Sequence, residues 1–99
     1  MRVILARSAR TELAEIWSHI ALDDPNSADH AIEQIVAGLE RLALFPLSGR
    51  SREELAASLR SYFIRPRHTV FYRIAEDRLE VVHVPHHSRD LTRFFSNER

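Results

Sequence analysis

The sequence predicts an α+β fold with the element order β-α-α-β-β-β. An N-terminal strand and an antiparallel two-helix hairpin precede a three-stranded antiparallel meander, and the helices pack on one face of the sheet. Three observations lead to this prediction. Apolar residues recur at helical spacing over 9–21 and again over 28–43. Two apolar and aromatic runs then flank a short turn at 66–68, and a third extended run follows at 79–84. We expect residues 1–99 to form one domain.

The composition is typical of a globular protein. The chain has 99 residues, of which 44% are hydrophobic and none is cysteine. The lack of cysteine excludes disulfides and thiolate metal sites and favours a cytoplasmic location. The apolar run Val3–Ala6 is too short for a signal peptide or a membrane span. We therefore expect a cytoplasmic protein with no membrane partner.

Charge is balanced overall but unevenly distributed. The 14 basic residues, all of them Arg, offset 14 acidic residues. Residues 1–48 carry 4 Arg against 7 acids, whereas residues 49–99 carry 10 Arg against 7 acids. An acidic half and a basic half predict two faces with different partners. The use of Arg rather than Lys fits bidentate recognition of phosphate or carboxylate, and genomic base composition explains it equally well.

The first half of the chain predicts a strand and two helices. Arg2–Arg7 is rich in Val, Ile and Leu and is expected to form a short strand. Ser8 is the expected N-cap of the first helix. Asp24 is the expected cap of the second, with Pro25 in its first turn. Trp17 lies on the apolar stripe of the first helix, and this position favours a core role over a role as a binding anchor. The acidic residues of the first helix, including Glu12, are expected to be solvated.

The second half predicts a short helical turn and then the meander. Residues 51–58 are expected to form the helical turn. A turn at 66–68 would place Phe63 opposite Phe71 and Ser61 opposite Arg73. Cross-strand partners share a sheet face. One face is therefore expected to carry Phe63, Arg65, Phe71 and Arg73, and the other Tyr62, Ile64, Val70, Tyr72 and Ile74. The unbroken apolar run around Val81 predicts an inner strand.

The hairpin carries an unusual concentration of positive charge. Arg60, Arg65, Arg67 and Arg73 lie on it, and no acidic residue occurs between positions 55 and 75. Such a set is expected to meet an anionic group inside or outside the chain. Alternatively, the hairpin is half-buried and its outer face carries Arg without a binding role. One interpretation is RNA cleavage, with Arg binding phosphate and His86 or His87 acting as general acid or base. The other is docking of a protein or protein–DNA partner without chemistry.

Two other kinds of site are not predicted. The chain has only two glycines, too few for a phosphate-binding loop. His83, His86 and His87 are close in sequence, but no carboxylate has ligand spacing with them. We therefore expect no metal and no cofactor.

Five stretches together resemble the RelE/ParE superfamily of toxins from type II toxin–antitoxin systems, and within it the ParE branch. They cover roughly residues 2–92 in the order and spacing of ParE-like chains. The stretches are ELAEIWSHIA (12–21), ALFPLSGRSREEL (43–55), LRSYFI (59–64), VFYRI (70–74) and VVHVPHHSRDL (81–91). No single stretch is diagnostic.

The resemblance implies a toxin that inhibits DNA gyrase by binding, without enzymatic activity. It also implies neutralisation by a ParD-like antitoxin whose tail folds on the toxin, and a toxin–antitoxin hetero-oligomer that reaches operator DNA through the antitoxin. The ending with His86, Arg89 and Asp90 matches ParE-like chains, whereas Pro85 and His87 depart from the pattern.

The resemblance also suggests site residues. The predicted target-binding residues are Arg60, Arg65, Tyr72, Arg73, His86, His87, Arg89 and Asp90. The predicted antitoxin-binding residues are Arg60, Arg65, Arg73, Leu13 and Trp17, beside a groove between the helix hairpin and the sheet. Two alternatives remain: an inactive relative that only binds partners, and a RelE-like endoribonuclease that cleaves mRNA. The nuclease would use Arg65, Arg73, His86 and His87.

Overall fold

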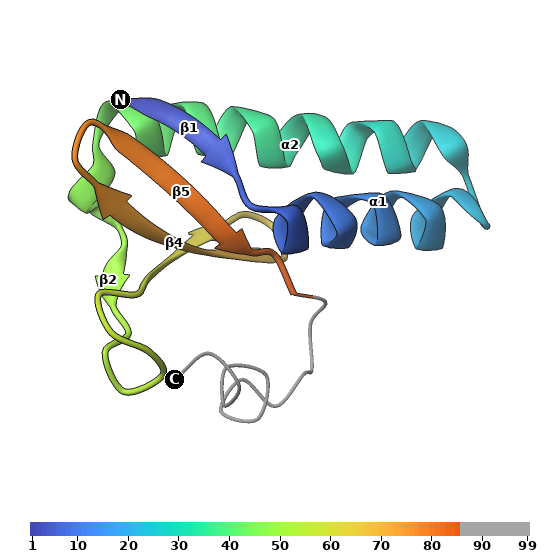
Figure 1. Cartoon of the computed structure of the whole chain (residues 1–99). Helices are drawn as coiled ribbons and strands as arrows, with labels where there is room; N and C mark the ends of the chain where they lie inside the picture. Colours follow the sequence, from blue (N-terminus) through green and yellow to red (C-terminus); the bar gives the residue numbers. More distant parts are fainter. Residues whose placement is uncertain (86–99) are drawn as a thin grey trace.

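A computed structural model describes residues 1–85, which form a five-stranded mixed sheet with two helices packed against it (Figure 1). The strand order is β1-β5-β4-β3-β2. The predicted helix hairpin and meander are both present, so the predicted fold class is confirmed. The elements are β1 Arg2–Leu5, α1 Arg7–Ala21, α2 Pro25–Leu44, the 3-10 turn η1 Pro46–Ser48, β2 Arg50–Ser51, β3 Arg60–Ile64, β4 His68–Ala75 and β5 Arg78–His83.

β5 is an inner strand, as predicted. It pairs antiparallel with β4 and parallel with β1, from Arg2 opposite Arg78 to Leu5 opposite Val81. Its last residues, Val81 to His83, are buried one after another. A strand covered on both faces loses the alternation of apolar and polar residues, which is the pattern of this run.

The two helix starts differ in how well the sequence predicts them. Asp24 caps α2 as expected, because its carboxylate accepts from the Asn26 N–H at 3.1 Å and from the Ser27 hydroxyl at 2.7 Å. The Ser27 bond, followed by the Asn26 bond, lowers the pKa of the Asp24 carboxyl. The predicted Ser8 cap is wrong. Helix α1 begins at Arg7 with Ala6 at its N-cap position, two residues earlier than predicted, and the Ser8 hydroxyl donates to the Val82 carbonyl at 2.6 Å.

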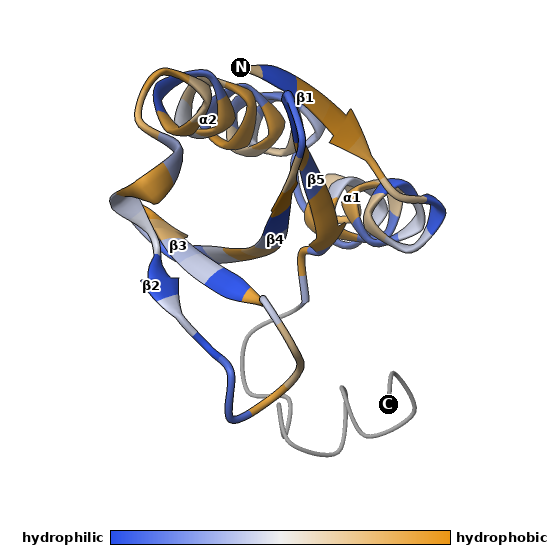
Figure 2. Ribbon diagram, turned by 60° about the vertical axis from the view of Figure 1, so that its left-hand side comes forward, coloured by the Kyte–Doolittle hydropathy of each residue, from blue (hydrophilic) through white to orange (hydrophobic). Residues whose placement is uncertain are grey.

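The main core lies between the helix hairpin and the facing side of the sheet. Fully buried residues of both layers meet there, among them Ile35 and Leu42 from α2 and Tyr72 and Val81 from the sheet. Gly38 lets α2 approach β3 closely, since a Cβ atom there would lie 2.6 Å from Ile64 Cδ1. The hydropathy colouring shows the apolar sides of the helices turned toward the strands (Figure 2).

The β3–β4 hairpin has the predicted faces but a shifted register. Phe63 lies opposite Thr69 rather than Phe71, and Ser61 lies opposite Phe71 rather than Arg73. The turn occupies 65–67, because Pro66 has no N–H to continue the ladder and Arg65 leaves the strand with it. A shift of two residues leaves the strand side chains on their predicted faces, but Arg65 lies in the turn and not on the face predicted for it.

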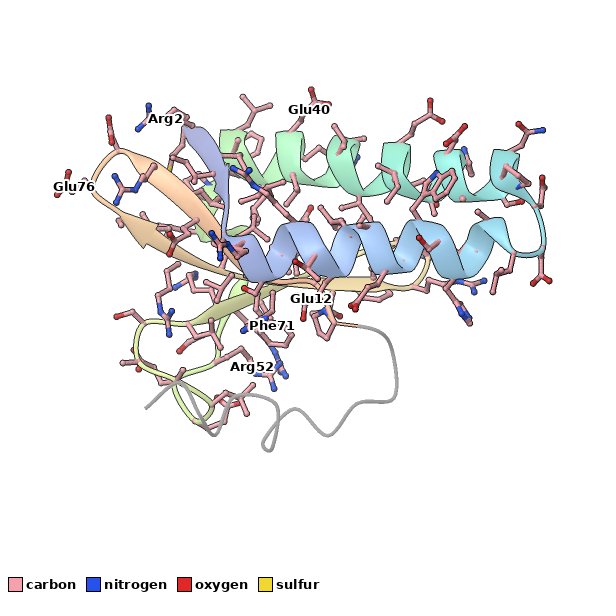
Figure 3. The ribbon with its side chains drawn as sticks, turned by 45° about the vertical axis from the view of Figure 1, so that its right-hand side comes forward. Arg2, Glu12, Glu40, Arg52, Phe71 and Glu76 are labelled. Carbon is pink, nitrogen blue, oxygen red and sulfur yellow. The ribbon has the colours of Figure 1, made fainter. Side chains whose placement is uncertain are left out.

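The opposite face of the sheet is covered in part by the chain between β2 and β3. The predicted helical turn over 51–58 is present only in part. The Arg52 carbonyl accepts from the N–H groups of Leu55 and Ala56, which is a single helical turn, but Ser51 belongs to the edge strand β2 with Arg50. This segment places Leu55, Ala56 and Leu59 against Phe71. Phe71 is fully buried in this second small core. The Arg52 guanidinium lies over the same ring, 5.6 Å from its centroid (Figure 3).

Candidate functional site

The arginines of the hairpin do not form one cluster. Arg65 and Arg67 lie in the turn and are exposed. Arg73 lies five positions past the start of β4 at His68, about 17 Å along the strand. Arg60 is at the same far end, because its neighbour in the ladder is Tyr72. The two ends of the hairpin therefore present separate charges.

Arg60 bonds to the chain itself. Its Nη2 atom donates to the Gly49 carbonyl at 2.7 Å and to the Leu47 carbonyl at 3.2 Å. Within residues 1–85, its buried Nε atom has no hydrogen-bond partner. Neutral backbone carbonyls of the connection after α2 thus satisfy part of the hydrogen bonding of this guanidinium.

Tyr72 also bonds to the connection after α2. Its side chain is fully buried, its hydroxyl donates to the Pro46 carbonyl at 2.6 Å, and it accepts from the Gly49 N–H at 3.1 Å. A buried hydroxyl with a donor and an acceptor satisfied is held firmly in place. Because the side chain is buried, Tyr72 cannot be the surface contact that the sequence predicted, and it holds the backbone of Pro46 and Gly49 in place.

Arg73 is half-buried and lies opposite Glu80 in the ladder. Its Nε atom donates to the Ala57 carbonyl at 3.0 Å. This bond ties β4 to the segment that covers the outer face of the sheet. The remaining predicted residues, His86, His87, Arg89 and Asp90, lie outside the described residues.

Glu12 is buried, and the prediction that it is solvated is wrong. Its carboxylate accepts from the Val84 N–H at 2.9 Å, and His83 Nδ1 lies 3.3 Å from both of its oxygens. Figure 3 shows Glu12 extending from α1. The sequence could have indicated this burial, because Glu12 lies three positions after Ala9 and four before Ile16, on the same side of the helix. The Glu12 carboxylate therefore holds the end of β5 through His83 and the Val84 N–H.

The described surface is hollowed where the tip of the helix hairpin meets the β3–β4 turn. Two adjoining cavities, of about 340 and 490 Å³, open there. We call them the tip groove. Apolar side chains of Ile16, Ile20 and Ala31 line it, together with polar and charged groups. The residues common to both cavities are Ile20, Asp24, Ser27, Arg67 and His68.

The tip groove matches the predicted groove in position but not in its named residues. Leu13 and Trp17 do not line it. Trp17 is 39% exposed, not a core residue, and its Nε1 atom donates to Asp29 Oδ1 at 2.8 Å, which links α1 to α2. Arg67 and His68, to which the pattern assigned no role, line both cavities because the turn folds back over the helices.

Two classes of site find no support in residues 1–85. The described side chains contain no group of three or more His, Asp or Glu placed to hold a metal ion. No helix of this part of the chain is long and apolar enough to cross a membrane.

Comparison with known proteins identifies the family. A model of the "ParE toxin of type II toxin-antitoxin system, parDE" matches residues 3–91. The chain belongs to the ParE toxin family. No match was found among curated proteins.

Solved structures show the same fold. A structure described as the chromosomal ParDE toxin–antitoxin system from P. aeruginosa aligns with a TM-score of 0.73 and 20% identity, and the alignment covers 85% of this chain and 92% of that one. A YoeB/ParE toxin from Agrobacterium tumefaciens aligns with a TM-score of 0.63 and 21% identity, covering 88% and 99%. At this identity the two structures support only the fold of this ParE toxin.

Proposed function

We propose that this ParE toxin inhibits DNA gyrase by binding to it, and that a ParD-like antitoxin neutralises it. The observation that carries the proposal is the family match over residues 3–91, which includes most of the chain and reaches the ending with Arg89 and Asp90. The action is stoichiometric binding, so toxicity follows the amount of toxin relative to gyrase.

The geometry of the described residues favours binding over RNA cleavage. A nuclease needs its cations and its general acid and base around one phosphate. Arg65 and Arg73 lie at opposite ends of the hairpin, and the Arg73 Nε atom donates to a backbone carbonyl. His83, the histidine at the end of β5, faces the Glu12 carboxylate.

The tip groove is our proposed binding site for the antitoxin tail. Its apolar floor suits the apolar side chains of a segment that folds on binding. Asp23 and Asp24 on one side and Arg67 on the other line the groove and would pair with charges of both signs. Arg65 precedes Pro66, which lines the groove, and would extend the contact along the turn. The complex would reach operator DNA through the antitoxin as a hetero-oligomer.

A supercoiling assay tests the proposal. Purified gyrase and relaxed plasmid are titrated with the toxin, alone and after mixing with its antitoxin. We expect loss of supercoiling or accumulation of cleaved DNA, and recovery with equimolar antitoxin. Full supercoiling at a large toxin excess would contradict the proposal.

Primer extension on translated messages after induction distinguishes the nuclease alternative, because only a nuclease gives mapped transcript ends. Antitoxin binding without any growth arrest would indicate an inactive relative.

A further inference from the structure

The end of α2 opposite the tip groove exposes three large apolar side chains in a row. Leu44 is 73% exposed, Phe45 69% and Leu47 71%. Single exposed apolar residues are ordinary on protein surfaces, but a contiguous set marks an interaction site. Figure 2 shows apolar colour along the chain that leaves the end of α2. We call residues 44–49 the apolar loop.

The backbone of the apolar loop is held by hydrogen bonds to the side chains of Tyr72 and Arg60, one of which, from the Gly49 N–H to the Tyr72 hydroxyl, is buried. The Tyr72 hydroxyl bonds to Pro46 and Gly49, and the Arg60 guanidinium bonds to the carbonyls of Leu47 and Gly49. Inside the loop, the Ser48 N–H donates to the Phe45 carbonyl at 2.9 Å. A loop whose backbone is fixed while its apolar side chains point outward is preorganised for binding, since little entropy is lost when a partner docks.

Gly49 is required by space in this arrangement. A Cβ atom at position 49 would meet the Tyr72 hydroxyl and would lie 2.6 Å from the Ser61 carbonyl oxygen. The close approach brings the loop backbone onto the buried tyrosine. Tyr72 thus lies buried against the loop backbone, while Phe45 and Leu47 are exposed.

Arginines lie on both sides of the apolar loop. The stretch 40–52 contains Arg41, Arg50 and Arg52 against one acidic residue, Glu40, which is exposed one helical turn before Leu44. Arg52 pairs with Glu54 at 2.7 Å. Arg41 and Arg50 are exposed on either side of the loop. The amino group of Met1 donates to the Ala43 carbonyl at 3.0 Å, which brings Arg2 next to the end of α2 (Figure 3). An apolar centre with a cationic rim complements an apolar pocket with an acidic rim.

We infer that the apolar loop is the surface by which the toxin docks on its protein target, at an apolar pocket edged by acidic side chains. This inference rests on the proposed function. The loop and the tip groove lie at opposite ends of the 20-residue helix α2, about 30 Å apart. Phosphate recognition would need the cations alone and not three exposed apolar side chains. In an isologous pair of toxins the cationic rims would face each other and repel.

The test uses the complete toxin with Phe45→Ser and Leu47→Ser combined. Both side chains are exposed, so the fold is expected to persist, and circular dichroism melting checks this. The matched control is Phe63→Ser, since Phe63 is 55% exposed on β3. We expect the double variant to lose growth arrest and to need at least about ten-fold more protein to inhibit gyrase. Its affinity for the antitoxin should change by less than about two-fold.

The possible results separate this inference from the proposed function. If the unmodified toxin leaves gyrase active, the proposed target is wrong, and growth arrest by the variants still decides the inference. Unchanged growth arrest by the double variant would overturn the inference. A loss of antitoxin affinity greater than the loss of toxicity would also overturn it and assign the loop to the antitoxin. A toxin dimer that dissociates in the double variant on size-exclusion chromatography would overturn it in favour of a second copy.

Discussion

The two ends of helix α2 present opposite kinds of surface. At its start, the tip groove is concave, and acidic and histidine side chains together with Arg67 edge an apolar floor. At its end, the apolar loop projects Phe45 and Leu47 into solvent among arginines. Figure 1 shows that α2 extends along the molecule between these regions. One helix thus separates the groove that we propose for the antitoxin tail from the loop that we propose for the target.

The difference suggests how a small toxin can serve two partners. The groove suits a flexible chain, which brings its own apolar side chains and orders them on binding. The apolar loop suits a folded surface that already has a pocket. Because the surfaces lie apart, substitutions are expected to affect one partner at a time. The following predictions test that separation, beginning with the largest effect.

Glu12→Ala is expected to destabilise the whole fold, and with it both the tip groove and the apolar loop. It removes the acceptor of the buried Val84 N–H and leaves His83 without this carboxylate, at a cost of about 2–3 kcal/mol in the free energy of unfolding. Glu12→Gln keeps one carbonyl oxygen and should lose less. Urea unfolding measures both variants. A loss below about 0.5 kcal/mol in Glu12→Ala would show that the pair contributes little.

Gln34→Trp is expected to close the tip groove. Gln34 lines the larger cavity, and an indole there would occupy the space of the antitoxin tail. Antitoxin affinity should fall by about 30-fold while gyrase inhibition stays unchanged. Val36→Trp is the matched control, because Val36 is exposed on the same helix and does not line the groove. Equal losses in the two variants would argue against the groove as the antitoxin site, and isothermal titration calorimetry measures both.

Tyr72→Phe is expected to loosen the apolar loop and leave the tip groove intact. It removes the hydroxyl that bonds to Pro46 and Gly49 and should cost about 1–2 kcal/mol in unfolding free energy. Hydrogen exchange of the Gly49 amide should accelerate, and inhibition of gyrase should weaken. Antitoxin affinity should stay constant. Unchanged exchange at Gly49 would contradict a holding role for the hydroxyl.

Asp24→Asn is expected to have the smallest effect on stability, visible only in acid. Hydrogen bonds from Ser27 and Asn26 lower the pKa of Asp24 in the folded protein. Such a carboxylate adds stability above its unfolded pKa, near 4, and this stability is lost as the pH falls through the folded pKa. Asparagine still caps the helix, but it does not titrate. Thermal melts between about pH 3 and 6 should therefore fall less steeply for Asp24→Asn. Parallel curves would contradict the assignment.

Most of the fold could be predicted because it follows from local periodicity. The stripes of α1 and α2, the Asp24 cap and the faces of the β3–β4 hairpin depend on residues close in sequence. The two-residue strand β2 and the cover over Phe71 depend on contacts between distant segments, and a run of mixed residues such as 51–58 carries no period that would reveal them.

The candidate site was harder to predict, because residue type does not determine a side chain's partner. Arg60 and Tyr72 looked like surface contacts but bond to the backbone of the loop after α2. Glu12 looked solvated but accepts from the end of β5. Arg67 gained a place in the tip groove only once the turn was folded over the helix hairpin. Each correction involves partners at least 11 positions apart in sequence or in different elements.

The most direct measurement of the two-ended arrangement is gyrase supercoiling with three toxins, each with and without antitoxin. The toxins are the unmodified chain, Gln34→Trp, and the combined Phe45→Ser and Leu47→Ser variant. We predict that the unmodified chain inhibits and is rescued by antitoxin. Gln34→Trp should inhibit but resist rescue, and the double variant should fail to inhibit while still binding antitoxin. Inhibition by the double variant at the level of the unmodified toxin would contradict the account.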